Sequence, residues 1–198
     1  MNLLFVGDVF GRPGRDALLG WLPGFVAERK VGFVVANGEN AANGAGITSK
    51  IALHLLDAGV DVITTGNHVW RQKEVFEFLV RDERIVRPAN YPEGAPGRGL
   101  TVRPARDGSS VAVIDLAGSL FMDTGLSPFR IVDRLVDQAR KQAETIVVDL
   151  HAEATSEKSR WATTSTAGSR SSSARTPTCR PPTPACCPAA PRTSPTSA

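Results

Sequence analysis

The segment NLLFVGDVFGRPG, residues 2–14, gives the clearest indication of fold class in this sequence. Its apolar run at 2–6 is typical of a buried strand, and the glycine-rich loop GDVFGRPG follows at 7–14. A pattern of helical period then runs from about Arg15 to Glu28. A buried strand that leads through a loop into a helix is the opening unit of an α/β domain.

The same alternation continues downstream and predicts one α/β domain over residues 1–158. Further strands are expected at 32–36, 60–65 and 145–150, with a strand pair at 100–103 and 111–116 around the turn signal Asp107-Gly108. Further helices are expected at 49–58, 71–80 and 131–139. The first of these helices should end at Gly59, because glycine readily adopts the left-handed conformation that stops a helix.

Residues 159–198 have a different composition. They contain no Val, Ile, Leu, Phe or Met and hold seven of the 14 prolines, so they cannot bury enough apolar surface to offset the entropy of ordering. The sequence therefore predicts a disordered tail rich in Pro, Ser, Thr and Arg. All three cysteines lie in this tail, so neither a disulfide framework nor a cysteine zinc site is expected in the domain.

The charge of the chain is also unevenly distributed. Its 23 basic and 20 acidic residues give a net charge of +3, but five arginines and no acidic residue fall in 159–198. The domain is therefore slightly acidic and has no basic stripe for stable nucleic-acid binding. No apolar run reaches the ~20 residues of a membrane span, and the N-terminus does not resemble a signal peptide, so we expect a cytoplasmic protein without a membrane partner.

Polar residues recur just beyond the C-terminal ends of the predicted strands. They are Asp8, Glu39, Asn40, Asn67, His68 and His151. In α/β sheets this edge is where side chains and loops converge on ligands. Carboxylate, amide and imidazole groups together suit divalent ions such as Mn, Fe(II), Zn or Mg, and two such ions can clamp the oxygens of a phosphoryl group. The pattern therefore favours a metal site that acts on phosphate.

Simpler interpretations of these residues exist. Asp8 can cap a turn or a helix, and three asparagines lie close to glycines, where turn chemistry alone explains them: Asn37, Asn40 and Asn67. The loop at 7–14 also has the position of a phosphate-binding loop in a Rossmann domain. Its glycines are not spaced G-x-G-x-x-G, however, and Asp8 would place a negative charge beside a pyrophosphate, so this interpretation fits poorly.

Five motifs carry a resemblance to a known family. They are GDVFGRPG (7–14), NGENAANGAGIT (37–48), TTGNHVW (64–70), RPANYP (87–92) and VVDLHAEATSEK (147–158). Together they resemble the YmdB-type branch of the calcineurin-like metallophosphoesterases, over essentially all of residues 1–158. Broader metallophosphoesterases usually show D-x-H at the first motif, whereas the third residue here is Phe10, as in this branch. The resemblance implies a sandwich of two β-sheets flanked by helices, with a dinuclear metal centre at the strand ends.

The resemblance also implies a role for each site residue. The implied metal ligands are Asp8, Glu39, Asn40, Asn67 and His151. Asp8 belongs to one ion, Asn67 and His151 belong to the second, and Glu39 bridges the two. His68 is the catalytic residue, which donates a proton to the leaving oxygen or stabilises the phosphoryl charge. The cofactor is then a pair of divalent ions (Fe, Mn, Zn or Mg, with Fe or Mn favoured), and the substrate is a small phosphoester such as 2′,3′-cyclic AMP.

The sequence departs from the family after His151. Members of the family are expected to continue with a strand that ends in G-T-H-T-H, whose two histidines each bind one ion, but no histidine follows His151 here. GC-rich codons for ARTPTCR (174–180) read G-T-H-T-H-V-P in a shifted frame, and residues 181–197 then give a strand-like continuation. We therefore expect a one-base deletion or a sequencing error near codons 159–160, with the sandwich incomplete at its C-terminus. The alternative is a natural Pro-rich tail.

The sequence thus predicts a metal-dependent phosphodiesterase or phosphatase. The chain as written is expected to bind metal weakly and to hydrolyse slowly, because two imidazole ligands are absent from it. The alternative function is a non-catalytic, metal- or nucleotide-binding regulatory domain that keeps the fold. The sequence leaves the oligomeric state open, and a homo-oligomer is one possibility.

Overall fold

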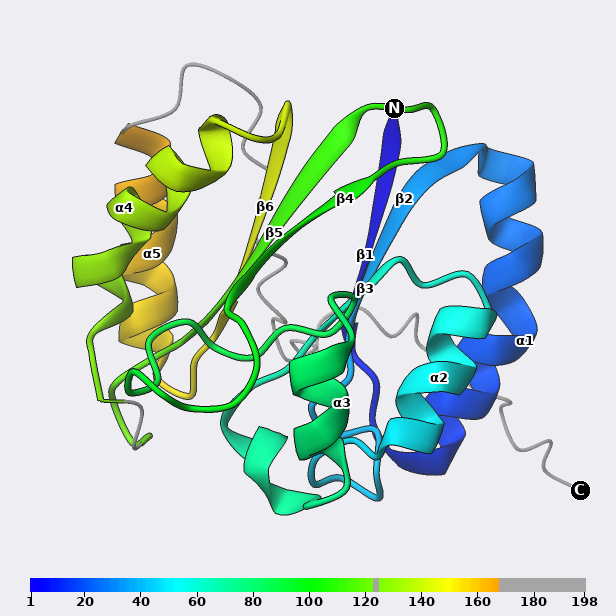
Figure 1. Cartoon of the computed structure of the whole chain (residues 1–198), viewed down its shortest axis with the longest axis horizontal. Helices are drawn as coiled ribbons and strands as arrows, with labels where there is room; N and C mark the ends of the chain where they lie inside the picture. Colours follow the sequence, from blue (N-terminus) through cyan, green and yellow to red (C-terminus); the bar gives the residue numbers. More distant parts are fainter. Residues whose placement is uncertain (123–124, 168–198) are drawn as a thin grey trace, which may run out of the picture.

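The structure is a computed structural model that describes residues 1–122 and 125–167. Two three-stranded sheets pack face to face (Figure 1). Sheet A consists of β1 (Asn2–Asp8), β2 (Val31–Asn37) and β3 (Val62–Thr64), all parallel. Sheet B consists of β4 (Leu100–Pro104), β5 (Ser110–Ala117) and β6 (Thr145–His151), in which β4 is antiparallel to β5 and β5 is parallel to β6.

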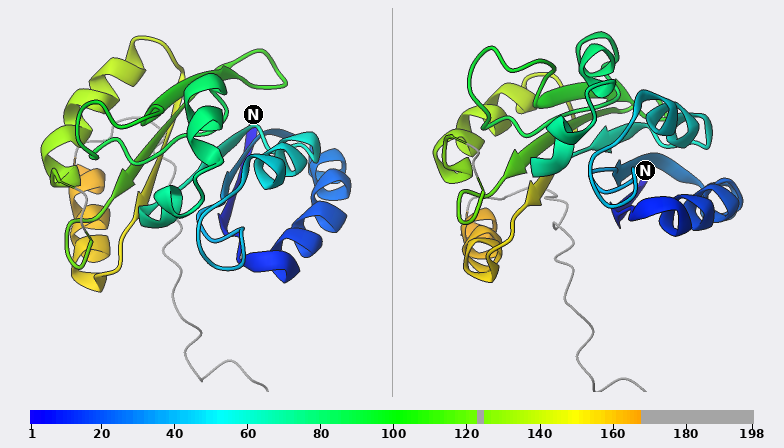
Figure 2. Two further views of the ribbon diagram at one scale, coloured as in Figure 1. Left: turned by 60° about the horizontal axis from the view of Figure 1, so that its bottom comes forward. Right: turned by 90° about the horizontal axis from the view of Figure 1, so that it is seen from below.

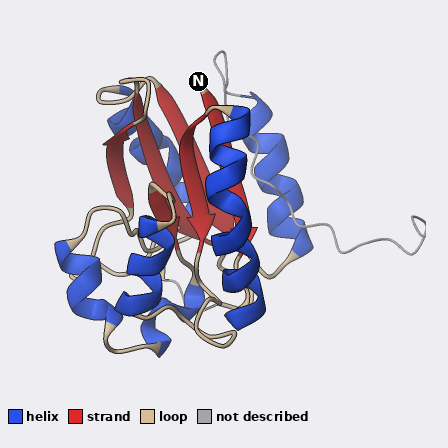
Figure 3. Cartoon of the chain, turned by 90° about the vertical axis from the view of Figure 1, so that its right-hand side faces the viewer, coloured by secondary structure: helices blue, strands red, loops and turns tan. Residues whose placement is uncertain are grey.

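Helices cover the outer face of each sheet (Figures 1 and 3). Helices α1 (Gly11–Arg29) and α2 (Ser49–Asp57) lie on sheet A, and α4 (Pro128–Arg140) and α5 (Thr155–Ala167) lie on sheet B. A 3₁₀ turn, η1 (Asn67–Arg71), and helix α3 (Val75–Arg81) follow β3. No helix within 1–122 and 125–167 has the length and hydropathy required to cross a membrane. The expected sandwich of two sheets flanked by helices is confirmed.

Helices α1 and α3 show the largest differences from the predicted starting positions, four residues each. Helix α1 begins at Gly11, four residues earlier than expected, and contains Pro13 in its first turn. Proline is tolerated there because the first N–H groups of a helix have no intrahelical partner. The helix expected at 71–80 begins only at Val75. Gln72 ends the preceding turn in an extended conformation, and its side-chain amide donates to a loop carbonyl at 2.9 Å, which separates the two elements.

Helix α5 continues past the predicted domain boundary at residue 158 and ends at Ala167. Trp161 accounts for this difference, because it is only 6% exposed and its ring centroid lies 5.8 Å from that of Phe129 in α4. The buried carboxylate of Glu157 also accepts two backbone N–H groups of the loop after β5. One tryptophan in a polar stretch gives no periodic signal. The disorder predicted for the remainder of the tail concerns residues outside those that the structure describes.

Candidate functional site

The C-terminal ends of strands from both sheets meet at one edge of the sandwich, which Figure 2 shows from below. Strand β1 ends at Asp8, and β6 ends at His151. Strand β2 leads directly to Glu39 and Asn40, and β3 leads through Gly66 to the turn that carries the remaining two residues, Asn67 and His68. All six polar residues predicted from strand ends therefore lie on loops or strand ends at this edge.

Five of the six side chains form a continuous chain of contacts. The amide of Asn40 donates to both carboxylate oxygens of Asp8 at 3.0 Å, and its Oδ1 lies 2.8 Å from Nδ1 of His68. The same nitrogen of His68 lies 3.3 Å from Oε1 of Glu39. Oε2 of Glu39 lies 2.7 Å from Nδ1 of His151. The contacts thus run from sheet A to sheet B, with Glu39 between the two histidines.

Glu39 is the most enclosed residue of the site, at 1% exposure. Its backbone N–H donates to Oδ1 of Asn37 at 3.1 Å, which holds the loop after β2 in place. Burial by itself lowers the pKa of His151, but the adjacent Glu39 carboxylate and the charge of Asp149 outweigh burial and raise that pKa. The raised pKa reflects the excess of negative charge around this imidazole.

Gly66 provides the space that Glu39 occupies. A Cβ on Gly66 would lie 1.7 Å from Oε2 of Glu39 and 2.8 Å from Cγ of His151. Its φ of −165° is ordinary extended backbone, so the close approach, and not the conformation, requires glycine at this position. Sequence reasoning did not identify this requirement, because it depends on a side chain from another strand.

Three buried polar atoms of the site have no hydrogen-bond partner: Oε2 of Glu39, Oδ1 of Asn67 and Nε2 of His151. Oε2 of Glu39 is close to His151, but the angles are not those of a hydrogen bond. Buried polar atoms nearly always have partners, so oxygen and nitrogen atoms left together without them fit a divalent cation. Within the described residues, no group of three or more His, Cys, Asp or Glu is arranged to hold a metal. These residues therefore fit a divalent cation only as part of its ligand set, and asparagine is one of the ligands.

A layer of buried hydrogen bonds lies beneath the site. Oδ2 of Asp149, on β6, accepts the hydroxyl of Thr64 at 2.6 Å and the amide of Asn37 at 3.1 Å. One carboxylate of sheet B therefore holds two strand ends of sheet A. Asn37 links Asp149 to Glu39, because its side-chain oxygen also accepts the backbone N–H of Glu39. Sequence reasoning gave Asn37 only turn chemistry and gave Asp149 no role. The available signal was an acidic residue inside the apolar strand TIVVDLH.

Asp115 lies beside Asp149, in register on the neighbouring strand β5. Its Oδ2 accepts the backbone N–H of Thr65 at 2.9 Å, whereas its Oδ1 is buried without a hydrogen-bond partner. Burial, reinforced by the charge of Asp149, raises the pKa of Asp115 well above its usual range. Burial also raises the pKa of Asp149, although its hydrogen bonds from Thr64 and Asn37 oppose the rise.

Comparisons with known proteins agree with this architecture. Residues 4–169 match the family model described as YmdB-like protein. The chain is 47% identical over 158 residues to a 2′,3′-cyclic-nucleotide 2′-phosphodiesterase of Bacillus subtilis (strain 168), which covers 80% of this chain and 60% of that protein. A solved structure of a protein from Thermus thermophilus aligns with a TM-score of 0.74 and 42% identity, over 82% of this chain and 62% of the other. A phosphatase of Mycoplasma pneumoniae aligns with a TM-score of 0.70 and 30% identity, over 80% and 58%. The chain thus spans about three fifths of the length of these relatives.

We expect Gly66→Ala to displace the Glu39 carboxylate, because the added methyl group would occupy its position. The free energy of unfolding, measured by urea denaturation, should fall by about 2 kcal/mol or more. Gly20→Ala is the matched control, since nothing lies within 4 Å of a Cβ there. That change, in the interior of α1, should instead add about 0.5–1 kcal/mol. An unchanged stability of Gly66→Ala would contradict this account.

Asp115→Asn should reduce the pH dependence of stability. Because the pKa of Asp115 is higher in the folded chain than its ordinary 3.8, the free energy of unfolding falls as the pH rises from that value toward the folded pKa. Asparagine can still accept the N–H of Thr65 and buries no charge. At pH 8 the variant should therefore be more stable than the wild type by about 1 kcal/mol or more, with the difference shrinking toward pH 4. Urea titrations across this range measure the effect, and a less stable variant at pH 8 would refute it.

Proposed function

The chain belongs to the family of YmdB-like proteins, and on that basis we propose that it is a metal-dependent phosphodiesterase or phosphatase. Its substrates would be small phosphoesters, with cyclic nucleotides such as 2′,3′-cyclic AMP as the favoured class. The observation that carries the proposal is the cluster of buried oxygen and nitrogen atoms without hydrogen-bond partners at the strand ends. The B. subtilis relative is a phosphodiesterase and the M. pneumoniae relative is a phosphatase, which supports the same reaction class.

The site residues can be assigned to the metals that this reaction requires. We assign Asp8 to one ion, Asn67 and His151 to the second, and Glu39 to both, with Asn40 as a further member of the site. Glu39 suits the shared position because its two oxygens already contact the two histidines on either side. When bound, a pair of divalent ions, with Fe or Mn favoured, would neutralise phosphate oxygens and activate the attacking water.

His68 is the proposed proton donor to the leaving oxygen. The two hydrogen bonds from the Asn40 amide to Asp8 orient that amide, so its carbonyl oxygen faces Nδ1 of His68. Nδ1 must then carry a hydrogen, so Nε2 is the nitrogen that faces substrate, and it donates its proton from the doubly protonated form of the ring. The His68 side chain is 30% exposed and therefore accessible to a ligand. Asp8 thus acts through Asn40 to set the tautomer of the catalytic histidine.

A non-catalytic metal- or nucleotide-binding domain is the second candidate function. It is favoured by the incomplete ligand set: among residues 1–122 and 125–167, no three or more His, Cys, Asp or Glu side chains are arranged to hold a metal, although unpartnered site atoms remain. The sequence as written also has no histidine after His151. We therefore propose that the 198-residue chain retains the fold and part of the metal site, with a reduced rate of hydrolysis.

His68→Ala should separate the two candidate functions. We expect it to lower the rate of hydrolysis of bis-p-nitrophenyl phosphate and of 2′,3′-cyclic AMP in the presence of Mn²⁺ by about 10²- to 10⁴-fold, because the proton donor is lost. Metal binding, measured by calorimetry, should change little. His54→Ala is the control, since His54 is exposed on α2, away from the strand ends. Equal hydrolysis by both variants would exclude His68 as the proton donor, whereas no hydrolysis by the wild type or by either variant would favour the non-catalytic function.

Restoring one base near codons 159–160 should raise both metal content and activity. The restored chain would contain the two further imidazoles, so elemental analysis should find more bound metal per chain and the hydrolysis rate should rise by about tenfold or more. Sequencing of the gene across codons 155–165 accompanies the assay. Two bound ions and an equal rate in the 198-residue chain would refute the proposed impairment.

A further inference from the structure

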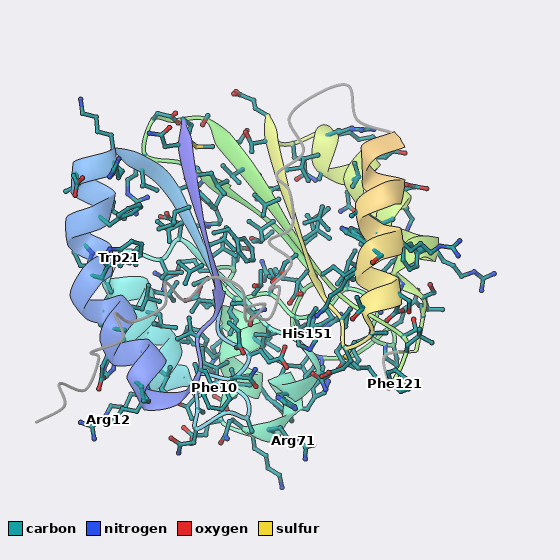
Figure 4. The ribbon with its side chains drawn as sticks, turned by 180° about the vertical axis from the view of Figure 1, so that it is seen from behind. Phe10, Arg12, Trp21, Arg71, Phe121 and His151 are labelled. Atoms are coloured by element: carbon teal, nitrogen blue, oxygen red, sulfur yellow. The ribbon has the colours of Figure 1, made fainter. Side chains whose placement is uncertain are left out.

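Phe10 is an exposed aromatic side chain close in sequence and in space to the candidate site. It follows Asp8 by two residues and is 61% exposed. Figure 4 places Phe10 at the same edge of the sandwich as His151. It also stands where D-x-H sequences have a histidine, yet a phenyl ring has no atom that can bind a metal or exchange a proton. The proposed hydrolysis leaves this residue without a role.

The ring of Phe10 is held against the backbone of Gly44. A Cβ on Gly44 would lie 2.8 Å from Cζ and 3.1 Å from Cε2 of Phe10, so the ring occupies the space that any other residue would fill. Gly44 also has a φ of +84°, a conformation that favours glycine. One side of the ring is therefore supported, while most of its surface stays open to solvent.

The backbone segments that carry Phe10 and Gly44 are both attached to Asn40. The N–H groups of Gly11 and Gly44 each donate to the carbonyl oxygen of Asn40 at 2.9 Å. The side chain of the same Asn40 contacts Asp8 and His68. The aromatic ring is thus anchored to the residue that orders the site. The residue that holds Asp8 through its side chain therefore also sets the position of the ring, through its backbone carbonyl.

We propose that Phe10 determines the substrate class by stacking on the nucleobase of a nucleoside phosphoester whose phosphate lies at the site. This inference rests on the proposed function and extends it to recognition. Stacking on an aromatic side chain tolerates every base, because each base has a π-face. Phe10 would therefore select nucleoside phosphoesters over other phosphoesters without strong preference among the four bases.

The test compares binding of three ligands to the full chain by calorimetry in the presence of Mn²⁺: adenosine 2′-monophosphate, adenosine and inorganic phosphate. Phe10→Ala should weaken the binding of adenosine 2′-monophosphate by about tenfold or more and leave the binding of phosphate within about twofold. Phe10→Leu keeps an apolar side chain without a ring and should show the same loss. Trp21→Ala, which removes an exposed aromatic ring from α1, should change neither affinity. Urea denaturation of each variant is the check that it folds.

The possible outcomes separate this inference from the proposed function. If Phe10→Ala binds adenosine 2′-monophosphate and phosphate as tightly as the wild type does, or loses affinity for both to the same extent, the role of Phe10 in base recognition is overturned. The proposed hydrolytic function is not affected by either result. If the wild type neither hydrolyses phosphoesters nor binds phosphate, the proposed function fails. Adenosine then decides the inference alone: binding that Phe10→Ala abolishes supports it, and binding that is absent or unchanged overturns it.

Discussion

The hydrogen bonds of one buried carboxylate, that of Asp149, hold the two sheets together at the edge where the site lies. Asp149 comes from sheet B, and the groups that bond to it, Thr64 and Asn37, come from two strands of sheet A. Removing a carboxylate from water is unfavourable unless hydrogen bonds or charges compensate it, and the loss of one partner of a buried charge costs about 3–5 kcal/mol. Packing of Phe33, Val35, Val113 and their neighbours between the sheets is less directional, because apolar contacts tolerate small displacements. The polar layer therefore defines how the sheets align at this edge.

The same layer creates the electrostatic character of the site. Asp115, Asp149 and Glu39 are all buried, and the charge of Glu39 raises the pKa of both Asp115 and Asp149. Within the described residues, His68 and His151 are the basic side chains that contact Glu39. A cation beside these buried carboxylates would favour their charged forms, so the layer suits a cation site. The raised pKa of His151 is a further sign of the same field.

The sequence allowed the sheet-edge residues to be predicted because each follows an apolar run that reads as a strand, and strand ends of a parallel sheet share an edge. Asp8, Glu39, Asn40, His68 and His151 do lie in one chain of contacts. The residues that support them could not be found in this way. Gly66, Asp115 and Asp149 matter because of what faces them from another strand or the other sheet, and local periodicity carries no information about such partners. Trp161 was missed for a similar reason, since its packing partner Phe129 lies on another helix.

The sandwich architecture has a consequence for how distance is controlled in this protein. Glu39 follows β2 of sheet A and His151 ends β6 of sheet B, so the separation between their backbones depends on how far apart the two sheets pack. That distance between the sheets is determined by the volumes of side chains that never touch a ligand, such as Phe33 and Val147. The volume of the inner core therefore sets the spacing between the two halves of the site, and that spacing matters for the chemistry as much as the polar residues do. Changes of core volume during evolution would alter the distance between the site residues of sheet A and those of sheet B without replacing any of these residues.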